Sequence, residues 1–150
     1  MISIAVERAD APGVHDLLQA SDDFHNALYP PEENYLLDAS TLLMPEVTVV
    51  VARSAGRAVG MGALVVTGGG FAEVKRMFVV DSARGGGVAG DILLALEEVA
   101  RSLSLATIRL ETGPDQPAAI AFYTRRGYVP VEAFDPYLDA TNSLFFAKRL

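Results

Sequence analysis

Residues 84–90 read Arg-Gly-Gly-Gly-Val-Ala-Gly, a glycine-rich stretch between a predicted strand and a predicted helix. Glycine lets the main chain turn several N–H groups toward one point, and the first turn of a helix adds partial positive charge there. A loop of this kind can bind phosphate or pyrophosphate. The alternative interpretation is a tight turn in which small residues allow close packing, since glycine-rich turns are common.

The segments next to this loop predict an antiparallel meander before it and a helix after it. Residues 47–53, 58–67 and 71–80 are separated by turn residues, which predicts three consecutive strands. Apolar residues at helical spacing follow the loop and predict one buried helix face: Val88, Ile92, Leu93, Leu96, Ala100 and Leu103.

The N-terminal part of the chain predicts a strand and a helix. Residues 2–7 alternate like a strand, and Asp10 followed by Pro12 is typical of a helix start. Consecutive prolines in residues 29–34 break regular structure. We expect one or two short helices in residues 35–43.

The C-terminal part predicts a further series of strands around one helix. The strands are expected at residues 106–111, 128–131 and 143–149. The helix is expected at residues 114–126, with Gly127 in the left-handed conformation that ends many helices. A strand–helix–strand crossover through the glycine loop should make strand 106–111 parallel to strand 71–80. The fold expected is α/β (α+β), a mixed, mostly antiparallel central sheet flanked by helices.

Length and composition predict one globular domain over residues 1–150. Of these residues 51% are hydrophobic and 21% are charged, which suits a packed core. The net charge of −7 argues against non-specific nucleic-acid binding, which needs basic patches. No signal peptide is visible and no apolar run could span a bilayer, so we expect a cytoplasmic protein without membrane partners.

The residue types available for chemistry are also restricted. The chain has no cysteine, so it has no thiolate nucleophile and no disulfide. His15 and His25 have no partners at metal-ligand spacing, and we expect no metal site.

The glycines also fit the pattern of a dinucleotide-binding loop. Gly85, Gly87 and Gly90 have its spacing, and Glu111 ends the next predicted strand. However, residues 81–84 separate the preceding strand from the first glycine, where that pattern has a tight turn. Too little chain remains for a doubly wound sheet. A Walker-type loop is excluded because no Gly-Lys-Ser/Thr follows.

From Arg84, the same loop has the form Arg-x-x-Gly-x-Ala, which resembles the acetyl-CoA pyrophosphate loop of the GCN5-related N-acetyltransferases. Residues 71–80 resemble the fourth strand of that family. Residues 116–128 resemble its Asn/Gln-x-x-Ala-x-x-Phe-Tyr-x-x-x-Gly-Phe segment, with Tyr128 in place of the last phenylalanine. The order and spacing of the three segments agree, and the order of elements matches over essentially the whole chain.

The resemblance implies acetyl-CoA as co-substrate and assigns residues to bind it. The main chain of Met77, Phe78 and Val79 would pair with the pantetheine arm, next to a β-bulge that separates two strands. Main-chain amides would hold the pyrophosphate, namely those of Arg84, Gly85, Gly86, Gly87, Val88 and Ala89. The Val79 N–H would donate to the thioester carbonyl oxygen.

The resemblance also suggests catalytic residues. Glu73, eleven residues before Arg84, would be the base that deprotonates the amine; the alternative is a surface charge paired with Lys75. Tyr123 would protonate the leaving thiolate, or would simply pack the helix on the sheet. Gln116 would contact the cofactor arm or cap a helix.

The function expected is therefore transfer of an acetyl group from acetyl-CoA to a primary amine of a small molecule or peptide, without a covalent enzyme intermediate. Tyr29, Glu32 and Tyr35 are candidates for contacts to this acceptor. The alternatives are an acyl-CoA-binding regulatory module without turnover and a dinucleotide-binding oxidoreductase. Members of the family are often dimers, so residues 144–147 form either an interface strand of a homodimer or part of the core.

Overall fold

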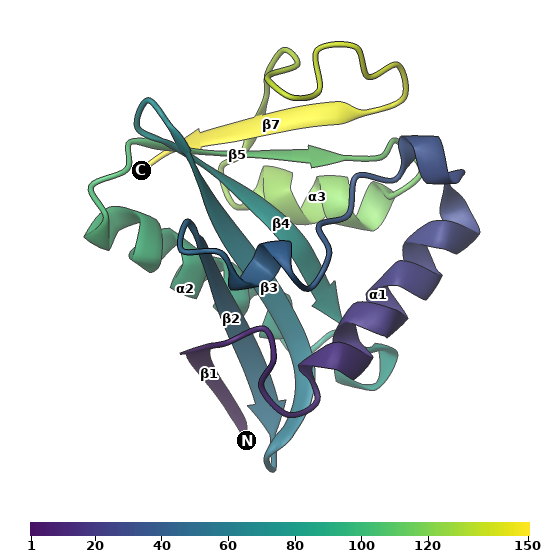
Figure 1. Ribbon diagram of the computed structural model, residues 1–150, viewed down its shortest axis with the longest axis vertical. Coiled ribbons are helices and arrows are strands. Elements are labelled where there is room, and N and C mark those ends of the chain that lie inside the picture. Colours follow the sequence, from purple (N-terminus) through teal and green to yellow (C-terminus); the bar gives the residue numbers. More distant parts are fainter.

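A seven-stranded sheet forms the centre of the protein in a computed structural model that describes residues 1–150 (Figure 1). The strands lie in the order β1-β2-β3-β4-β5-β7-β6, and β4 and β5 are the parallel pair in an otherwise antiparallel sheet. The mixed, mostly antiparallel sheet expected from the sequence is confirmed. The strands are β1 (Ile2–Glu7), β2 (Val47–Ser54), β3 (Arg57–Gly68), β4 (Phe71–Val79), β5 (Thr107–Thr112), β6 (Val129–Pro130) and β7 (Leu144–Arg149).

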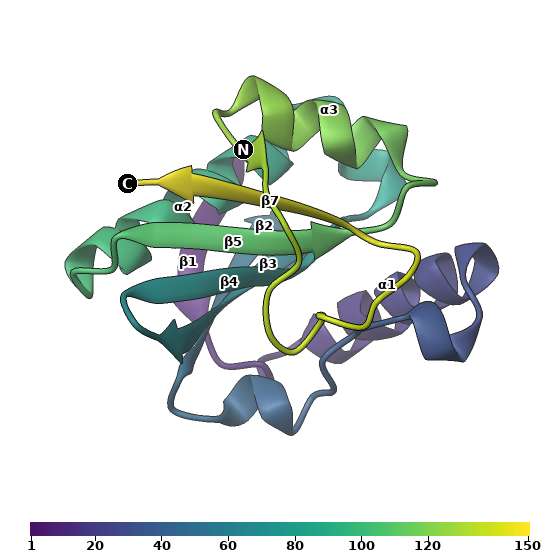
Figure 2. The same ribbon diagram turned by 90° about the horizontal axis from the view of Figure 1, so that it is seen from above.

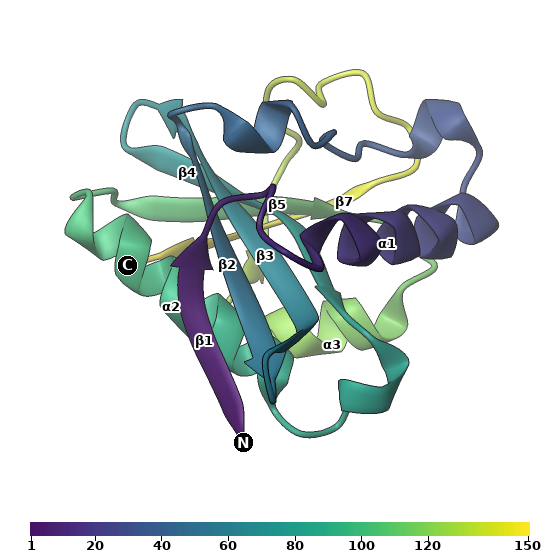
Figure 3. The ribbon, with the colours of Figure 1, turned by 60° about the horizontal axis from the view of Figure 1, so that its bottom comes forward.

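Helices cover both faces of the sheet. They are α1 (Val14–Leu28), α2 (Val88–Ser102) and α3 (Pro117–Arg125), with short 3₁₀ turns η1 (Pro31–Glu33), η2 (Thr41–Leu43) and η3 (Asp81–Ala83). Figures 2 and 3 show α2 and α3 on one side of the sheet and α1 on the other. No helix is both long enough and apolar enough to cross a membrane.

The central strands are buried on both faces, because alternate residues of a strand point to opposite sides of the sheet. On β2, Val50 belongs to the core under α2 with Ile92. Its neighbour Val51 belongs to the core under α1 with Leu17. This double burial explains why residues 47–53 form a nearly continuous apolar run.

The predicted strands agree with the structure to within one residue at each end, whereas several predicted helix boundaries are wrong. Helix α1 begins at Val14 and not at Asp10, because Gly13 adopts a left-handed conformation with a φ of +82°. The Asp10 carboxylate instead pairs with Arg8 at 2.9 Å. Helix α3 begins at Pro117, three residues later than predicted.

In residues 35–43, where one or two short helices were expected, the structure has one short 3₁₀ turn, η2, and no other helix. The carbonyl oxygen of Leu37 accepts a hydrogen bond from Arg76 Nε at 2.8 Å and therefore serves a tertiary contact. The Asp38 carboxylate accepts from the Thr41 N–H at 2.8 Å and begins the short turn.

At the end of α2, Leu103 is 51% exposed and does not belong to the buried helix face. It follows the last helical residue, and Ser104 reverses the chain with a φ of +58°. Gly127 has a φ of +91° after α3, as predicted.

A buried carboxylate links α2 to the C-terminal part of the sheet. Glu97 is 1% exposed and accepts hydrogen bonds from the Tyr128 hydroxyl at 2.9 Å and Lys148 Nζ at 3.1 Å.

Tyr128→Phe should lower the free energy of unfolding by about 1.5–3 kcal/mol, the usual contribution of a hydrogen bond to a charged group. Urea unfolding measures this loss. Tyr35→Phe is the control, because its hydroxyl has no protein partner; equal effects would contradict the assignment.

Candidate active site

A gap separates β4 from β5 over most of their length. The two strands pair only from Phe71 to Glu73 on β4, and beyond Glu73 they diverge. The cause is a bulge, in which Arg76 and Met77 both lie opposite Gly62 of β3. The bulge implied by the family resemblance is therefore present, and it opens the sheet next to Met77.

Arg76 holds this bulge in an uncommon conformation. Its φ is +58°, a left-handed value that costs energy for a residue other than glycine. The guanidinium lies 2.7 Å from the Asp22 carboxylate and donates to Ser21 Oγ at 3.2 Å, and both partners lie on α1. These contacts, with the one to Leu37, tie the bulge to α1 and the segment after it.

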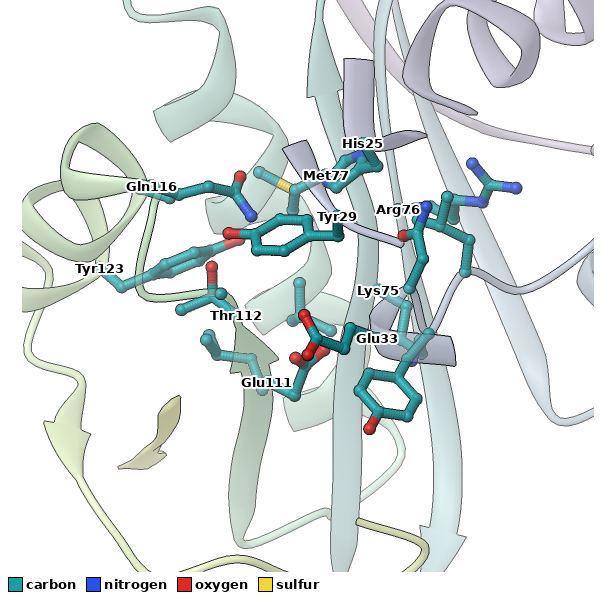
Figure 4. Close-up of a pocket in the computed structure, with 17 residues that line it drawn as sticks. His25, Tyr29, Glu33, Lys75, Arg76, Met77, Glu111, Thr112, Gln116 and Tyr123 are labelled. Carbon is teal, nitrogen blue, oxygen red and sulfur yellow. The ribbon is translucent and has the colours of Figure 1, made fainter. Parts of the chain in front are cut away.

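The gap opens into a cavity of about 100 Å³ (Figure 4). Its walls come from the end of α1 and the segment after it, from β4 and β5, and from the start of α3. The residues labelled in Figure 4 are His25, Tyr29, Glu33, Lys75, Arg76, Met77, Glu111, Thr112, Gln116 and Tyr123.

Three of the residues proposed for cofactor binding or catalysis line this cavity: Met77, Gln116 and Tyr123. Tyr123 is 7% exposed, and burial raises the pKa of its hydroxyl. Its ring packs against Tyr128 with 5.6 Å between ring centres, which is the packing that the alternative interpretation predicts. The Gln116 side chain makes no hydrogen bond that caps α3, so the capping alternative is not what the structure shows.

The end of β4 presents main-chain groups to the gap. Val80 N–H donates to Val59 O on β3 at 2.9 Å. Because N–H groups alternate along a strand, the Val79 N–H points away from β3, toward the open edge. Phe78 is paired with Met61 on β3, and its side chain packs on the α1 side of the sheet.

The glycine loop offers a run of free main-chain donors. No N–H group from Gly85 to Gly90 donates to another group of the protein, and Asp91 is the first to do so, to Gly87 O at 3.0 Å. Gly85 and Gly87 have left-handed φ values of +85° and +82°. Six consecutive free donors at a helix N-terminus fit a pyrophosphate group.

Arg84 differs from the other residues of the predicted loop. Its N–H donates to Asp81 O at 3.2 Å, so this amide is already used within the protein. Its guanidinium donates to Val79 O at 2.9 Å and pairs with the Asp81 carboxylate at 2.9 Å. The side chain thus connects the glycine loop to the end of β4.

Glu73 lies beside the cavity but does not line it. It is 5% exposed, and its carboxylate accepts a hydrogen bond from the Tyr137 hydroxyl at 2.6 Å. Lys75 Nζ lies 3.6 Å from the same carboxylate. The pairing with Lys75 is therefore as expected, but both side chains are buried rather than solvated.

The structure brings in two carboxylates that the sequence analysis did not select as catalytic or acceptor-binding residues. Glu111, at the end of β5, and Glu33, in η1, line the cavity. Of the residues suggested for the acceptor, Tyr29 and Tyr35 line the cavity, whereas Glu32 is exposed outside it. The position of Glu111 at the carboxyl end of the strand parallel to β4 was the available signal that it would lie at the cavity.

No group of three or more histidine, aspartate or glutamate side chains is arranged to hold a metal ion. His15 is exposed, and the His25 ring is hydrogen bonded to Ser21 O at 2.8 Å. The glycine loop follows the antiparallel strands β3 and β4. A dinucleotide-binding fold has a parallel strand–helix–strand unit at this position, so the structure argues against that alternative.

Comparison with known proteins identifies the family. Residues 14–128 match the model of the Acetyltransferase (GNAT) family. This range includes the gap, the glycine loop and the cavity residues at the start of α3. The chain belongs to this family and is an acetyl-CoA-dependent N-acetyltransferase.

Two similar proteins support the assignment, and a third shares the fold. The chain is 41% identical to the IAA acetyltransferase of Azospirillum brasilense over 150 residues, which cover 99% of this chain and 98% of the relative. A Klebsiella pneumoniae structure described provisionally as an acyl-CoA N-acyltransferase is 35% identical, with a TM-score of 0.84 and coverage of 100% and 98%. A GNAT family acetyltransferase from Elizabethkingia anophelis, solved with acetyl-CoA bound, shares the fold at 16% identity, with a TM-score of 0.76 and coverage of 99% and 98%.

Proposed function

We propose that residues 1–150 act as one domain that moves the acetyl group of acetyl-CoA directly to a primary amine of a small molecule or peptide. The observation that carries this proposal is a set of free main-chain donors on the two sides of the turn η3. Six free N–H groups of the glycine loop lead to the Val79 N–H at the gap, and Tyr123 lines the cavity beyond it.

Binding of acetyl-CoA is assigned to main-chain groups. Residues 85–89 would hold the pyrophosphate, and residues 77–79 would lie along the pantetheine arm. When bound, acetyl-CoA supplies a thioester whose carbonyl carbon accepts the amine and whose sulfur leaves as a thiolate. The Val79 N–H would stabilise negative charge on the carbonyl oxygen, a contribution of about 3 kcal/mol in comparable sites.

Tyr123 is proposed as the acid. Its hydroxyl, buried and neutral, would donate a proton to the departing thiolate. The acceptor ammonium loses two protons overall, because it becomes an amide. One replaces the proton that Tyr123 gives to the thiolate, and the other is released to solvent.

A base is needed because an alkylammonium has a pKa of about 10–11 and is almost fully protonated at neutral pH. Glu73, the base suggested by the family resemblance, would act indirectly. The Tyr137 hydroxyl covers its carboxylate, so a proton would reach Glu73 through that hydroxyl or through water.

Thiol release in the presence of a panel of amines tests the proposal, and the absence of cysteine removes protein background. We expect one N-acetylated amine for each thiol released, with no acetylated protein detectable by mass spectrometry. Thiol release without an acetylated amine, or an acetyl group carried by the protein during turnover, would contradict direct transfer.

The glycine loop can be tested with two matched variants. Gly87 and Gly56 both have left-handed φ values, +82° and +81°, and an added Cβ would meet no atom within 4 Å at either site. Each change to alanine should cost about 1–2 kcal/mol of stability, because the left-handed conformation disfavours a Cβ. Only Gly87→Ala should weaken acetyl-CoA binding, by about 10-fold, equivalent to roughly 1.4 kcal/mol. Equal affinities in calorimetry would show that residues 85–89 do not hold the cofactor.

A further inference from the structure

The cavity contains two carboxylates that have no cationic partner. Glu111 accepts a hydrogen bond from Ser143 Oγ at 2.8 Å, and Glu33 accepts one from the Asn142 amide at 3.1 Å. Neither side chain takes part in an ion pair, although both line the cavity. In Figure 4 they lie on the same side of the Tyr29 ring.

The cations near these carboxylates are already engaged. Lys75 donates to the Tyr137 hydroxyl and pairs with Glu73, while Arg76 pairs with Asp22. Burial raises the pKa of Glu111, and the charge of Glu73 adds to this effect while Lys75 opposes it. A cation that enters the cavity would therefore meet two carboxylates that have no ion-pair partner within the protein.

An independent observation also points to a ligand. Tyr29 is 6% exposed, and its buried hydroxyl has no hydrogen-bond partner. A Cβ on Gly113 would lie 1.8 Å from this hydroxyl oxygen, which places the oxygen against the main chain that follows Glu111 and Thr112. Figure 4 shows the ring reaching across the cavity toward Gln116 and Tyr123. Buried hydroxyls are nearly always paired, so this one is suited to bind a group of a substrate.

We infer that the cavity is a binding site for a small acceptor with two cationic groups, such as an aliphatic diamine. Glu111 binds the reacting ammonium, and Glu33 binds the second cationic group. The inference rests on the proposed function. Glu111, which lines the cavity, takes the place of Glu73 as the base. One proton passes from the ammonium nitrogen to a Glu111 carboxylate oxygen, which leaves a neutral amine with a lone pair to form the new C–N bond. The Tyr29 hydroxyl accepts a hydrogen bond from the same ammonium.

The size and charge of the protein agree with this class of acceptor. The cavity of about 100 Å³ is small. Under the proposed function it would also receive the reacting end of acetyl-CoA. A short aliphatic chain fits such a space better than a peptide. The net charge of −7 raises the local concentration of cations around the protein.

Four acceptors distinguish the alternatives: 1,4-diaminobutane, 1-aminobutane, 4-aminobutanoate and IAA. The first three have the same carbon chain and differ in the charge at the far end, and IAA is included because a relative is called an IAA acetyltransferase. Wild-type kcat/KM should be about 10-fold higher for 1,4-diaminobutane than for 1-aminobutane, a factor typical of one charge-assisted contact. It should be lowest for 4-aminobutanoate.

Glu33→Gln should remove the advantage of the diamine over 1-aminobutane, a loss of about 10-fold in their ratio. Glu32→Gln is the matched control, since this neighbouring carboxylate is exposed and outside the cavity; it should leave the ratio unchanged. Equal use of diamine and monoamine by the wild type, or a preference for IAA or 4-aminobutanoate, would overturn the inference and leave acetyl transfer intact. Binding of acetyl-CoA without acetylation of any acceptor would overturn both.

Discussion

Tyr123→Phe is expected to lower kcat by about 100-fold or more, the usual contribution of a general acid, while acetyl-CoA binds as before. The change removes one hydroxyl from the cavity and keeps the buried ring that packs against Tyr128. Without that hydroxyl, the thiolate must leave unprotonated or take its proton from water. Thiol release measures kcat, and calorimetry measures acetyl-CoA affinity.

Tyr128→Phe is the control for this experiment. It removes a neighbouring buried hydroxyl that is bonded to Glu97 and does not line the cavity. We expect nearly normal kcat and reduced stability from this control. Unchanged kcat in Tyr123→Phe would reject Tyr123 as the acid and favour a packing role for its ring.

Glu111→Gln is expected to lower kcat/KM by about 100-fold, because the amide cannot accept a proton and removes the charge that binds the ammonium. Glu73→Gln should have a smaller effect, since Glu73 lies behind the Tyr137 hydroxyl and does not line the cavity. Initial rates of thiol release with 1,4-diaminobutane compare the two variants directly. The opposite order would make Glu73 the base, as the resemblance first suggested.

The pH dependence gives a second readout for Glu111. Burial raises the pKa of this carboxyl, so it becomes protonated, and inactive as a base, at a higher pH than an exposed glutamate. The kcat/KM of the wild type should therefore fall on acidification, and the fall should begin at a higher pH than the pKa of an exposed glutamate would give. Glu111→Gln should lose this dependence, and an unchanged profile in the variant would assign the fall to another group.

The strands were the most predictable part of the fold. Apolar runs such as residues 47–53 are bounded by turn residues, and both features are local. Helix boundaries were less predictable where tertiary contacts decide them. The Leu37 carbonyl oxygen accepts a hydrogen bond from Arg76, which is 39 residues away in the sequence, and no local pattern in residues 35–43 predicts that contact.

The candidate site was predictable where it depends on motifs and unpredictable where it depends on packing. The glycine loop and Tyr123 lie within continuous segments of recognisable spacing. Glu111 and Glu33 come from distant segments that meet only because β4 and β5 diverge at the bulge. Glu73 lies on β4 and Glu111 on β5, and the two differ in their access to the cavity because Tyr137 and Lys75 contact the Glu73 carboxylate.

Titration of the purified protein with acetyl-CoA, read by calorimetry with NADH and ATP as parallel controls, tests the central claim most directly. Free N–H groups at residues 85–90 and the gap between β4 and β5 predict micromolar binding of acetyl-CoA and no comparable binding of the two controls. Failure to bind acetyl-CoA, or tighter binding of NADH, would contradict the assignment of the glycine loop and gap as the acetyl-CoA site.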